Sequence, residues 1–89
     1  MLKIKNKDVI DGKINHIDIG DATEIICTGC TELTELPNWP SVTKFICSEC
    51  TKLTKLPNWP LVTEVTCWYC PGLTELPNWS LVTEVNFCK

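Results

Sequence analysis

Apolar side chains recur along this chain with a period of 20 residues. Residues 22–41, 42–61 and 62–81 each carry apolar residues at repeat positions 1, 4, 6, 9 and 12, and residues 82–89 begin a fourth copy. A fixed period of this length is typical of a solenoid, because one repeat cannot bury its own apolar face and must stack on its neighbours. The sequence therefore predicts a stack of coils.

The two halves of each repeat have different patterns. In the first half Val65 and Cys67 alternate with Glu64, Thr66 and Trp68, which is the period-two rhythm of a short strand. The second half contains Leu-Pro-Asn-Trp, and proline fixes φ and removes a backbone donor, which excludes a helix of useful length. Each coil is predicted to be a short parallel strand followed by an extended, non-helical return.

The first 21 residues do not repeat. Asp11-Gly12 is a two-residue hairpin signal between short aliphatic stretches, and Ile17 and Ile19 alternate with polar residues. Because the open end of a solenoid must be covered, we expect residues 1–21 to form a β-hairpin cap over the solenoid of residues 22–89. The strand with Ile17 and Ile19 should run antiparallel to the strand with Ile25, since too few residues separate them for a parallel crossover.

Net charge and hydropathy exclude several classes of protein. At 89 residues the chain forms one structural domain, and its formal net charge of -3, with acids and bases interspersed, does not favour a nucleic acid or an anionic membrane as partner. The sequence lacks both an apolar run long enough to span a bilayer and the apolar core of a signal peptide. We expect an intracellular, cytoplasmic protein.

Charged residues at equivalent positions of neighbouring repeats change sign. Two positions carry an acid in the first and third repeats and a base in the second, namely Glu24, Lys44, Glu64 and Glu35, Lys55, Glu75. Neighbouring parallel strands lie about 4.8 Å apart, so opposite charges on adjacent coils attract. Cross-coil ion pairs that fix the register are predicted, each contributing at most about 1 kcal/mol.

Seven cysteines raise the question of metal binding. Six of them form three Cys-x-x-Cys pairs separated by 16 residues, a spacing that fits a zinc template: Cys27 and Cys30, Cys47 and Cys50, Cys67 and Cys70. The repeat imposes the same spacing on any copied pair, and inward-facing cysteine packs as a small hydrophobe. Two ladders of buried thiols, at positions 6 and 9, are favoured over zinc and over disulfides, and an odd count without a signal peptide favours the reduced state.

Tryptophan and threonine also recur in phase. Trp39, Trp59 and Trp79 occupy one position of the return segment, and an aromatic side chain copied at identical phase is predicted to fill the core. Threonines at position 2 of each repeat are predicted to form a ladder beside the strands.

The pattern A/V-x-x-I/F/V-x-C-x-x-C-x-x-L-T-x-L-P-N-W resembles the leucine-rich repeat, L-x-x-L-x-L-x-x-N/C-x-L. The resemblance covers residues 22–89 and departs from the family in the cysteine at position 6. It implies a right-handed coil whose strands line a concave binding face. The short form with cysteine and L-P-x-W-P also resembles arrays encoded by giant DNA viruses of amoebae, which implies a viral protein located in the host cytoplasm or the virion.

The resemblance also implies a set of binding residues, the strand positions between the inward ones. Trp68 and Tyr69 stand out among them, because exposed aromatic residues are favoured at binding hot spots. The full set is Glu24, Ile26, Thr28, Lys44, Ile46, Ser48, Glu49, Glu64, Thr66, Trp68, Tyr69, Glu84 and Asn86.

The expected function is that of a non-enzymatic protein–protein interaction module without a cofactor, since the lone His16 has no neighbouring nucleophile or acid that would suggest catalysis. Two alternatives stay open: a self-assembling structural or scaffold protein, such as a virion component, and a zinc-stabilised binding module. The strand with Val85, Phe87 and Cys88 lacks a following coil, so we also expect a homodimer joined through this edge by two-fold antiparallel pairing.

Overall fold

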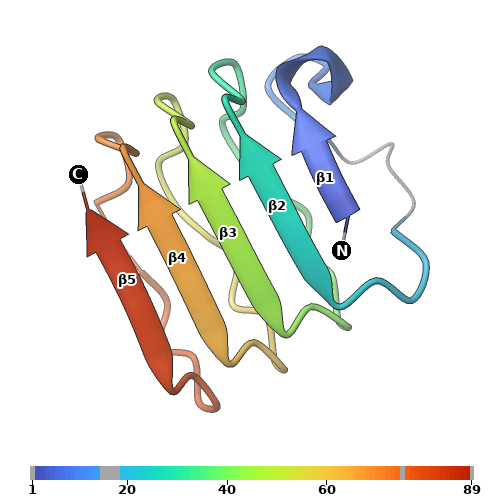
Figure 1. The fold of residues 1–89 in the computed structure, drawn as a ribbon, viewed down its shortest axis with the longest axis vertical. Helices are drawn as coiled ribbons and strands as arrows, with labels where there is room; N and C mark the ends of the chain where they lie inside the picture. The colour runs from blue at the N-terminus through green and yellow to red at the C-terminus, as the bar shows by residue number, and fades with distance from the viewer. Residues whose placement is uncertain (1, 15–18, 75, 89) are drawn as a thin grey trace.

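A computed structural model describes residues 2–14, 19–74 and 76–88, with the side chains of 87 and 88 outside the description. Five strands form one parallel sheet in chain order, as Figure 1 shows: β1 (Leu2–Lys5), β2 (Glu24–Thr28), β3 (Lys44–Ser48), β4 (Glu64–Trp68) and β5 (Glu84–Cys88). A short 3-10 turn, η1 (Asn6–Asp8), follows β1, and the described residues contain no α-helix. The predicted solenoid is confirmed.

The register of β2 to β5 follows the sequence period. Ile25 pairs with Phe45, and Phe45 pairs with Val65, each 20 positions later. All three side chains are fully buried, while their neighbours in the strands are more accessible. The alternation predicted for the strands is therefore present, and equivalent residues of successive repeats lie side by side.

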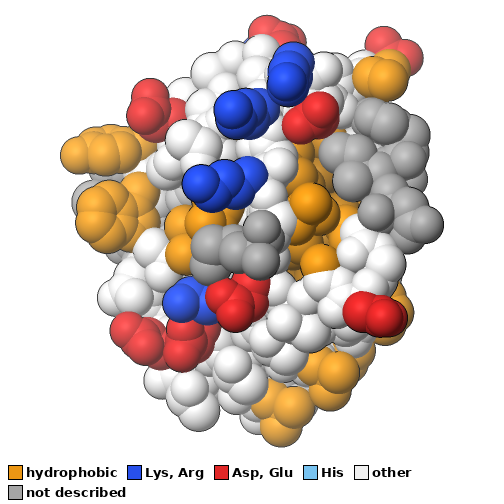
Figure 2. Space-filling model, turned by 45° about the vertical axis from the view of Figure 1, so that its right-hand side comes forward, with side chains coloured by type: hydrophobic (Ala, Val, Ile, Leu, Met, Phe, Trp, Pro, Cys, Tyr) orange, Lys and Arg blue, Asp and Glu red, His pale blue; other side chains and the backbone are white. Residues whose placement is uncertain are grey.

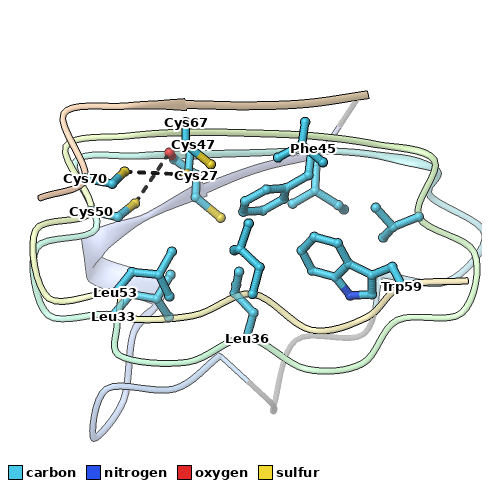
Figure 3. Packing of buried hydrophobic residues seen from close by; sticks show 14 of the residues in the cluster. Cys27, Leu33, Leu36, Phe45, Cys47, Cys50, Leu53, Trp59, Cys67 and Cys70 are labelled. Carbon is cyan, nitrogen blue, oxygen red and sulfur yellow. Dashed lines mark hydrogen bonds between the residues drawn. The ribbon is translucent and has the colours of Figure 1, made fainter. Parts of the chain in front are cut away.

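Extended returns cover the inner face of the sheet and form the second layer of the molecule (Figure 1). Leu33, Leu53 and Leu73 from these returns are fully buried against the strands. Figure 3 shows the thiols toward one end of the interior above the leucines, with Phe45 and Trp59 toward the other end. The absence of helix from the described part of the returns follows from their prolines, as predicted.

The N-terminal segment differs from the prediction. The neighbour of β2 is β1, which runs parallel to it with Leu2 paired to Ile25. The expected antiparallel pairing of a strand containing Ile17 and Ile19 with β2 is therefore wrong; residue 17 itself lies outside the described residues, and Ile19 lies outside every strand. The connection of residues 6–23 is long enough for a parallel crossover. Paired residues of β1 and β2 are 23 positions apart in the sequence, three more than paired residues of successive repeats.

The Asp11-Gly12 turn is present and is attached to the first repeat. Ile10 and Lys13 exchange two backbone hydrogen bonds of 2.9 Å around it, as the hairpin signal predicted. The Gly12 carbonyl then accepts hydrogen bonds from the backbone N–H and the hydroxyl of Thr34, at 2.8 and 3.1 Å. This segment packs Ile14 into the core, where it is fully buried.

The two ends of the sheet are covered to different extents. In β1 the inward Ile4 is 1% exposed, because residues from the first crossover pack beside it. In β5 the inward Val85 is 41% exposed, and Leu76 of the last return is 39% exposed, whereas its counterpart Leu56 is 4% exposed. The C-terminal end of the described solenoid therefore presents part of its core to solvent.

Ladders of equivalent side chains join the coils. The hydroxyls of Thr43, Thr63 and Thr83 donate to the backbone carbonyl of the threonine one repeat earlier, at 3.2–3.3 Å. Trp39 and Trp59 stack with ring centroids 6.3 Å apart, and both are buried. The predictions of a threonine ladder and of core tryptophans are confirmed.

Candidate functional site

The outward face of β2 to β5 carries the strand residues that the sequence singled out. Alternation along each strand gives three rows across this face, whose members are neighbours in the sheet register. The rows are Glu24, Lys44, Glu64 and Glu84; Ile26, Ile46, Thr66 and Asn86; and Thr28, Ser48 and Trp68, with Cys88 next in register.

Trp68 is the aromatic residue in these rows, with 52% of its surface exposed. Its register partner is Ser48, and Ile46 lies diagonally across from it on the neighbouring strand, beside Thr66. Diagonal side chains on one sheet face lie within reach of an aromatic ring. Trp68 and Ile46 therefore belong to one outward-facing area, as the sequence predicted.

The turns after β2, β3 and β4 share one left-handed backbone conformation. Gly29, Glu49 and Tyr69 all have positive φ, of 64°, 57° and 55°. The N–H of Gly29 donates to the Ser48 carbonyl and that of Glu49 to the Trp68 carbonyl, both at 2.9 Å. Because the next strand holds each of these two turns, the side chain of Glu49 projects from an anchored backbone.

Tyr69 and Glu49 lie at the rim of an open hollow beside these turns. The hollow has a volume of about 450 Å³ and is lined by Thr31, Glu49, Thr51 and Tyr69. Tyr69 is 60% exposed, so its ring is available at this rim. Sequence reasoning included Glu49 and Tyr69 but missed Thr31 and Thr51, which follow the second cysteine of their repeats and could have been found from the 20-residue register.

Ion pairs hold several of the other charges on the surface. Lys44 pairs with Glu64 at 3.6 Å, as predicted for that position. Lys52 pairs with Glu32 at 3.1 Å across one repeat. The cross-coil pairing predicted for Glu35 with Lys55 is wrong, because Glu35 pairs with Lys13 of the N-terminal segment at 3.1 Å. Residue 75, the third member of that predicted row, lies outside the described residues.

Figure 2 shows acidic and basic side chains interspersed on the face nearest the N-terminal end of the sheet, with apolar side chains visible among them. The charged groups on this face therefore do not form one large area of a single sign. The surface agrees in this respect with the charge pattern of the sequence.

Among the described side chains, six cysteines form a buried group of free thiols, most of which are labelled in Figure 3. The two predicted ladders interlock: the sulfurs of Cys47 and Cys70 lie 3.5 Å apart, and Cys50 Sγ lies 3.8 Å from the Cys27 carbonyl. The Cys30 thiol donates to the Ile4 carbonyl at 3.5 Å, which extends the contacts to β1. Within the described residues, no set of three potential ligands is arranged to hold a metal ion.

The environment of four of these thiols opposes their ionisation. Interaction with the Cys27 thiol, together with burial, raises the pKa of Cys30 to about 12, and interaction with Cys30 raises the pKa of Cys50 to about 11. Contacts with Cys50 and Cys67 raise the pKa of Cys47, and burial raises that of Cys70. A neutral thiol is a poor nucleophile and metal ligand, so in this state these four cysteines act as packing groups.

In the part of the chain that is described, no helix is long and apolar enough to cross a bilayer. Residue 16, the single histidine position, lies outside the described residues. Comparison with protein-family profiles, with curated protein sequences and with solved structures finds no match to this chain.

Proposed function

We propose that this protein is a non-enzymatic binding module of leucine-rich repeat type, which holds a protein partner on the outward face of its sheet. The contact is centred on Trp68, Tyr69 and Ile46. The surrounding strand residues form the polar margin of the contact, which excludes water around the central aromatic residues.

The exposure of Trp68 and Tyr69 carries this proposal. Trp39, Trp59 and Trp79 are all at most 7% exposed, so the fold has interior positions for tryptophan and Trp68 does not occupy one. The equivalent residues of the earlier repeats are Thr28 and Ser48, which shows that the coil itself does not require an aromatic side chain there. Large exposed aromatics on a rigid surface are the residue types that contribute most to protein interfaces.

The backbone around this area also favours binding. Trp68 ends β4, whose inward side chains are buried and whose two neighbours are β3 and β5. A side chain presented from such a strand loses little backbone entropy when a partner docks. The module therefore gains binding free energy from a surface that is ordered before the partner arrives.

The test is quantitative affinity capture of partner proteins from a lysate of the native cell, with the intact chain as bait. The double variant Trp68→Ser/Tyr69→Ser is used as a second bait. We expect the variant to lose the partner that the natural chain retains, and a purified partner to bind at least tenfold more weakly by calorimetry. Ile10→Ser is the matched control, since Ile10 is another exposed apolar residue, on the N-terminal turn. Equal retention by all three proteins would contradict the proposal.

Self-association through the C-terminal end is a second candidate, favoured by the exposure of Val85 and Leu76 there. β5 has a hydrogen-bonded neighbour only on its β4 side within the described chain, so a second copy could add its own β5 by two-fold antiparallel pairing. Val85 would lie at this contact with Phe87 and Cys88, whose side chains are outside the described structure. Light scattering at about 100 μM tests it, because typical homodimers are assembled at that concentration. Val85→Lys should then lower the measured mass to that of a monomer.

The buried thiols suit a reducing compartment, and an intracellular location is part of the same proposal. Zinc is a weaker explanation of the cysteines, because the raised pKa of Cys30, Cys47, Cys50 and Cys70 favours neutral thiols over the thiolates that zinc requires.

A further inference from the structure

We infer that the hollow beside Tyr69 receives a cationic side chain of the partner, best an arginine, from a peptide that also covers Trp68. This inference rests on the proposed function and specifies the chemistry of the partner segment. The residues that carry it are Glu49, Tyr69, Thr31 and Thr51, which line one hollow of about 450 Å³.

Glu49 supplies the charge complementarity. It is exposed at the hollow, and the described ion pairs of the molecule, Lys13–Glu35, Lys44–Glu64 and Lys52–Glu32, leave its carboxylate without a basic partner. The nearest lysine in the sequence, Lys52, is held by Glu32 at 3.1 Å. A carboxylate at the edge of a concave surface in a chain of net charge -3 attracts a cation.

The position of Glu49 is set by the backbone. Its positive φ and the 2.9 Å hydrogen bond from its N–H to the Trp68 carbonyl tie it to the strand that carries Trp68. The carboxylate and the two aromatic residues therefore belong to one anchored unit across β3 and β4. A ligand that contacts the aromatic area lies within reach of the carboxylate.

The ring of Tyr69 and the two threonines give the hollow the residue types that suit a guanidinium group. A guanidinium group stacks on aromatic faces and offers planar, paired donors that match a carboxylate, and its remaining donors can reach threonine hydroxyls. Lysine supplies a single point charge and satisfies fewer of these groups. An apolar residue next to the arginine in the peptide would pack on Trp68 and Ile46.

The test uses backbone and indole NMR resonances of the full chain, titrated with three blocked peptides. The first is acetyl-Leu-Arg-Leu-Arg-Leu-amide, the second replaces each arginine by citrulline, which has nearly the same shape without charge, and the third replaces each by glutamate. We expect the arginine peptide to shift resonances of Glu49, Thr51 and Tyr69 and to bind about three- to fivefold more tightly than the citrulline peptide, the range set by one exposed charge pair. The difference should shrink in about 1 M salt, where the Debye length is about 3 Å.

Two variants with the same change of charge locate the effect. Glu49→Gln should abolish the preference for arginine over citrulline, whereas Asp21→Asn, at an exposed acid that precedes β2 and lies outside the proposed contact, should keep it. If the two peptides bind the natural chain equally, or if Asp21→Asn has the same effect as Glu49→Gln, the inference is overturned. A stronger response of the same resonances to neutral chitohexaose or maltohexaose would also overturn it, in favour of a carbohydrate ligand.

The outcome is separable from that of the proposed function. Failure of the arginine preference leaves the capture experiment with Trp68→Ser/Tyr69→Ser unaffected, since that experiment depends on the aromatic residues alone. Loss of capture in the double variant together with equal binding of the arginine and citrulline peptides would keep the binding module and reject its cationic ligand.

Discussion

The indole Nε1–H of Trp59 donates a hydrogen bond of 3.0 Å to the carbonyl oxygen of Pro37, which lies 22 positions earlier in the preceding coil. Trp79 repeats the contact with Pro57 at 2.9 Å. One residue thus fills the core and satisfies a backbone carbonyl whose own peptide segment, rich in proline, has few donors to offer. This hydrogen bond explains why proline and tryptophan occur together in the Leu-Pro-Asn-Trp segment of each repeat.

Replacement of Trp59 by leucine should be strongly destabilising. The ring is buried, stacks on Trp39 and lies 4.9 Å from the Phe45 ring, so the change creates a cavity and leaves the Pro37 carbonyl without its donor. We expect a loss of about 3–5 kcal/mol in the free energy of unfolding, measured by urea denaturation. Trp68→Leu is the control and should change stability by less than about 0.5 kcal/mol. Similar losses in the two variants would contradict the assignment of Trp68 to the surface.

Gly12→Ala should destabilise the attachment of the N-terminal segment. A Cβ on Gly12 would lie 2.6 Å from Thr34 Oγ1, and the residue has a φ of +79°. A loss of about 2–3 kcal/mol is expected from the combined strain and displacement of Thr34. Gly29→Ala is the matched control, since its φ of +64° is similar but the added Cβ would meet nothing within 4 Å. It should cost about 1 kcal/mol. Equal thermal midpoints for the two variants would show that the contact with Thr34 has no energetic role.

Leucine truncations in successive coils should differ in cost according to position. Leu56 and Leu76 occupy equivalent positions, but only Leu56 is covered by a following coil. Leu56→Ala should cost about 2–4 kcal/mol, and Leu76→Ala about 1 kcal/mol, in the free energy of unfolding. If Leu76→Ala is as costly as Leu56→Ala at low protein concentration, the C-terminal end is covered in solution by something outside the described chain.

Stability should fall in mildly alkaline solution. In the folded chain the pKa of Cys30 is raised to about 12 and that of Cys50 to about 11, while an unfolded chain ionises its thiols at their ordinary value. Between these values the unfolded state has lost protons that the folded state retains, so the free energy of unfolding decreases as pH rises from about 8 to about 11. Each such thiol should contribute roughly 1 kcal/mol of loss near pH 10.

The measurement is a series of urea titrations across that pH range under argon with a phosphine reductant. Cys50→Ala removes one of the titrating groups, so its curve should fall less steeply than that of the natural chain. A midpoint that is constant across the range would mean that the thiols are accessible to solvent, contrary to their burial.

The repeated part of the fold could be derived from the sequence because translation by 20 positions determines it. Once Phe45 was placed inward, the same placement held for Ile25 and Val65, and their pairing in register followed. The N-terminal strand could not be derived in this way. Leu2 and Ile4 offer only two inward residues, and their offset of 23 positions from Ile25 and Cys27 does not match the repeat.

The site was predictable in its exposed aromatic residues and less so in its shape. Trp68 was recognisable because it breaks the repeat, but the hollow depends on the positive φ of Glu49 and Tyr69, which the sequence indicates only through Gly29 at the equivalent position of the first repeat. The contact between Cys47 and Cys70 likewise depends on how far the turn carries position 9 toward the neighbouring coil. The shape of the hollow and this thiol contact are set by backbone geometry, which the spacing of residue types does not predict.

Among the described residues, side chains donate hydrogen bonds to backbone carbonyls of other coils in one direction only. The acceptor always lies in an earlier coil than the donor. The threonine hydroxyls, the indoles of Trp59 and Trp79, and the thiols of Cys30 and Cys50 all follow this rule. A chain that leaves the ribosome N-terminus first therefore meets each acceptor already in place when the matching donor is synthesised. Growth of the structure can keep pace with translation, each new coil being templated by the one before it.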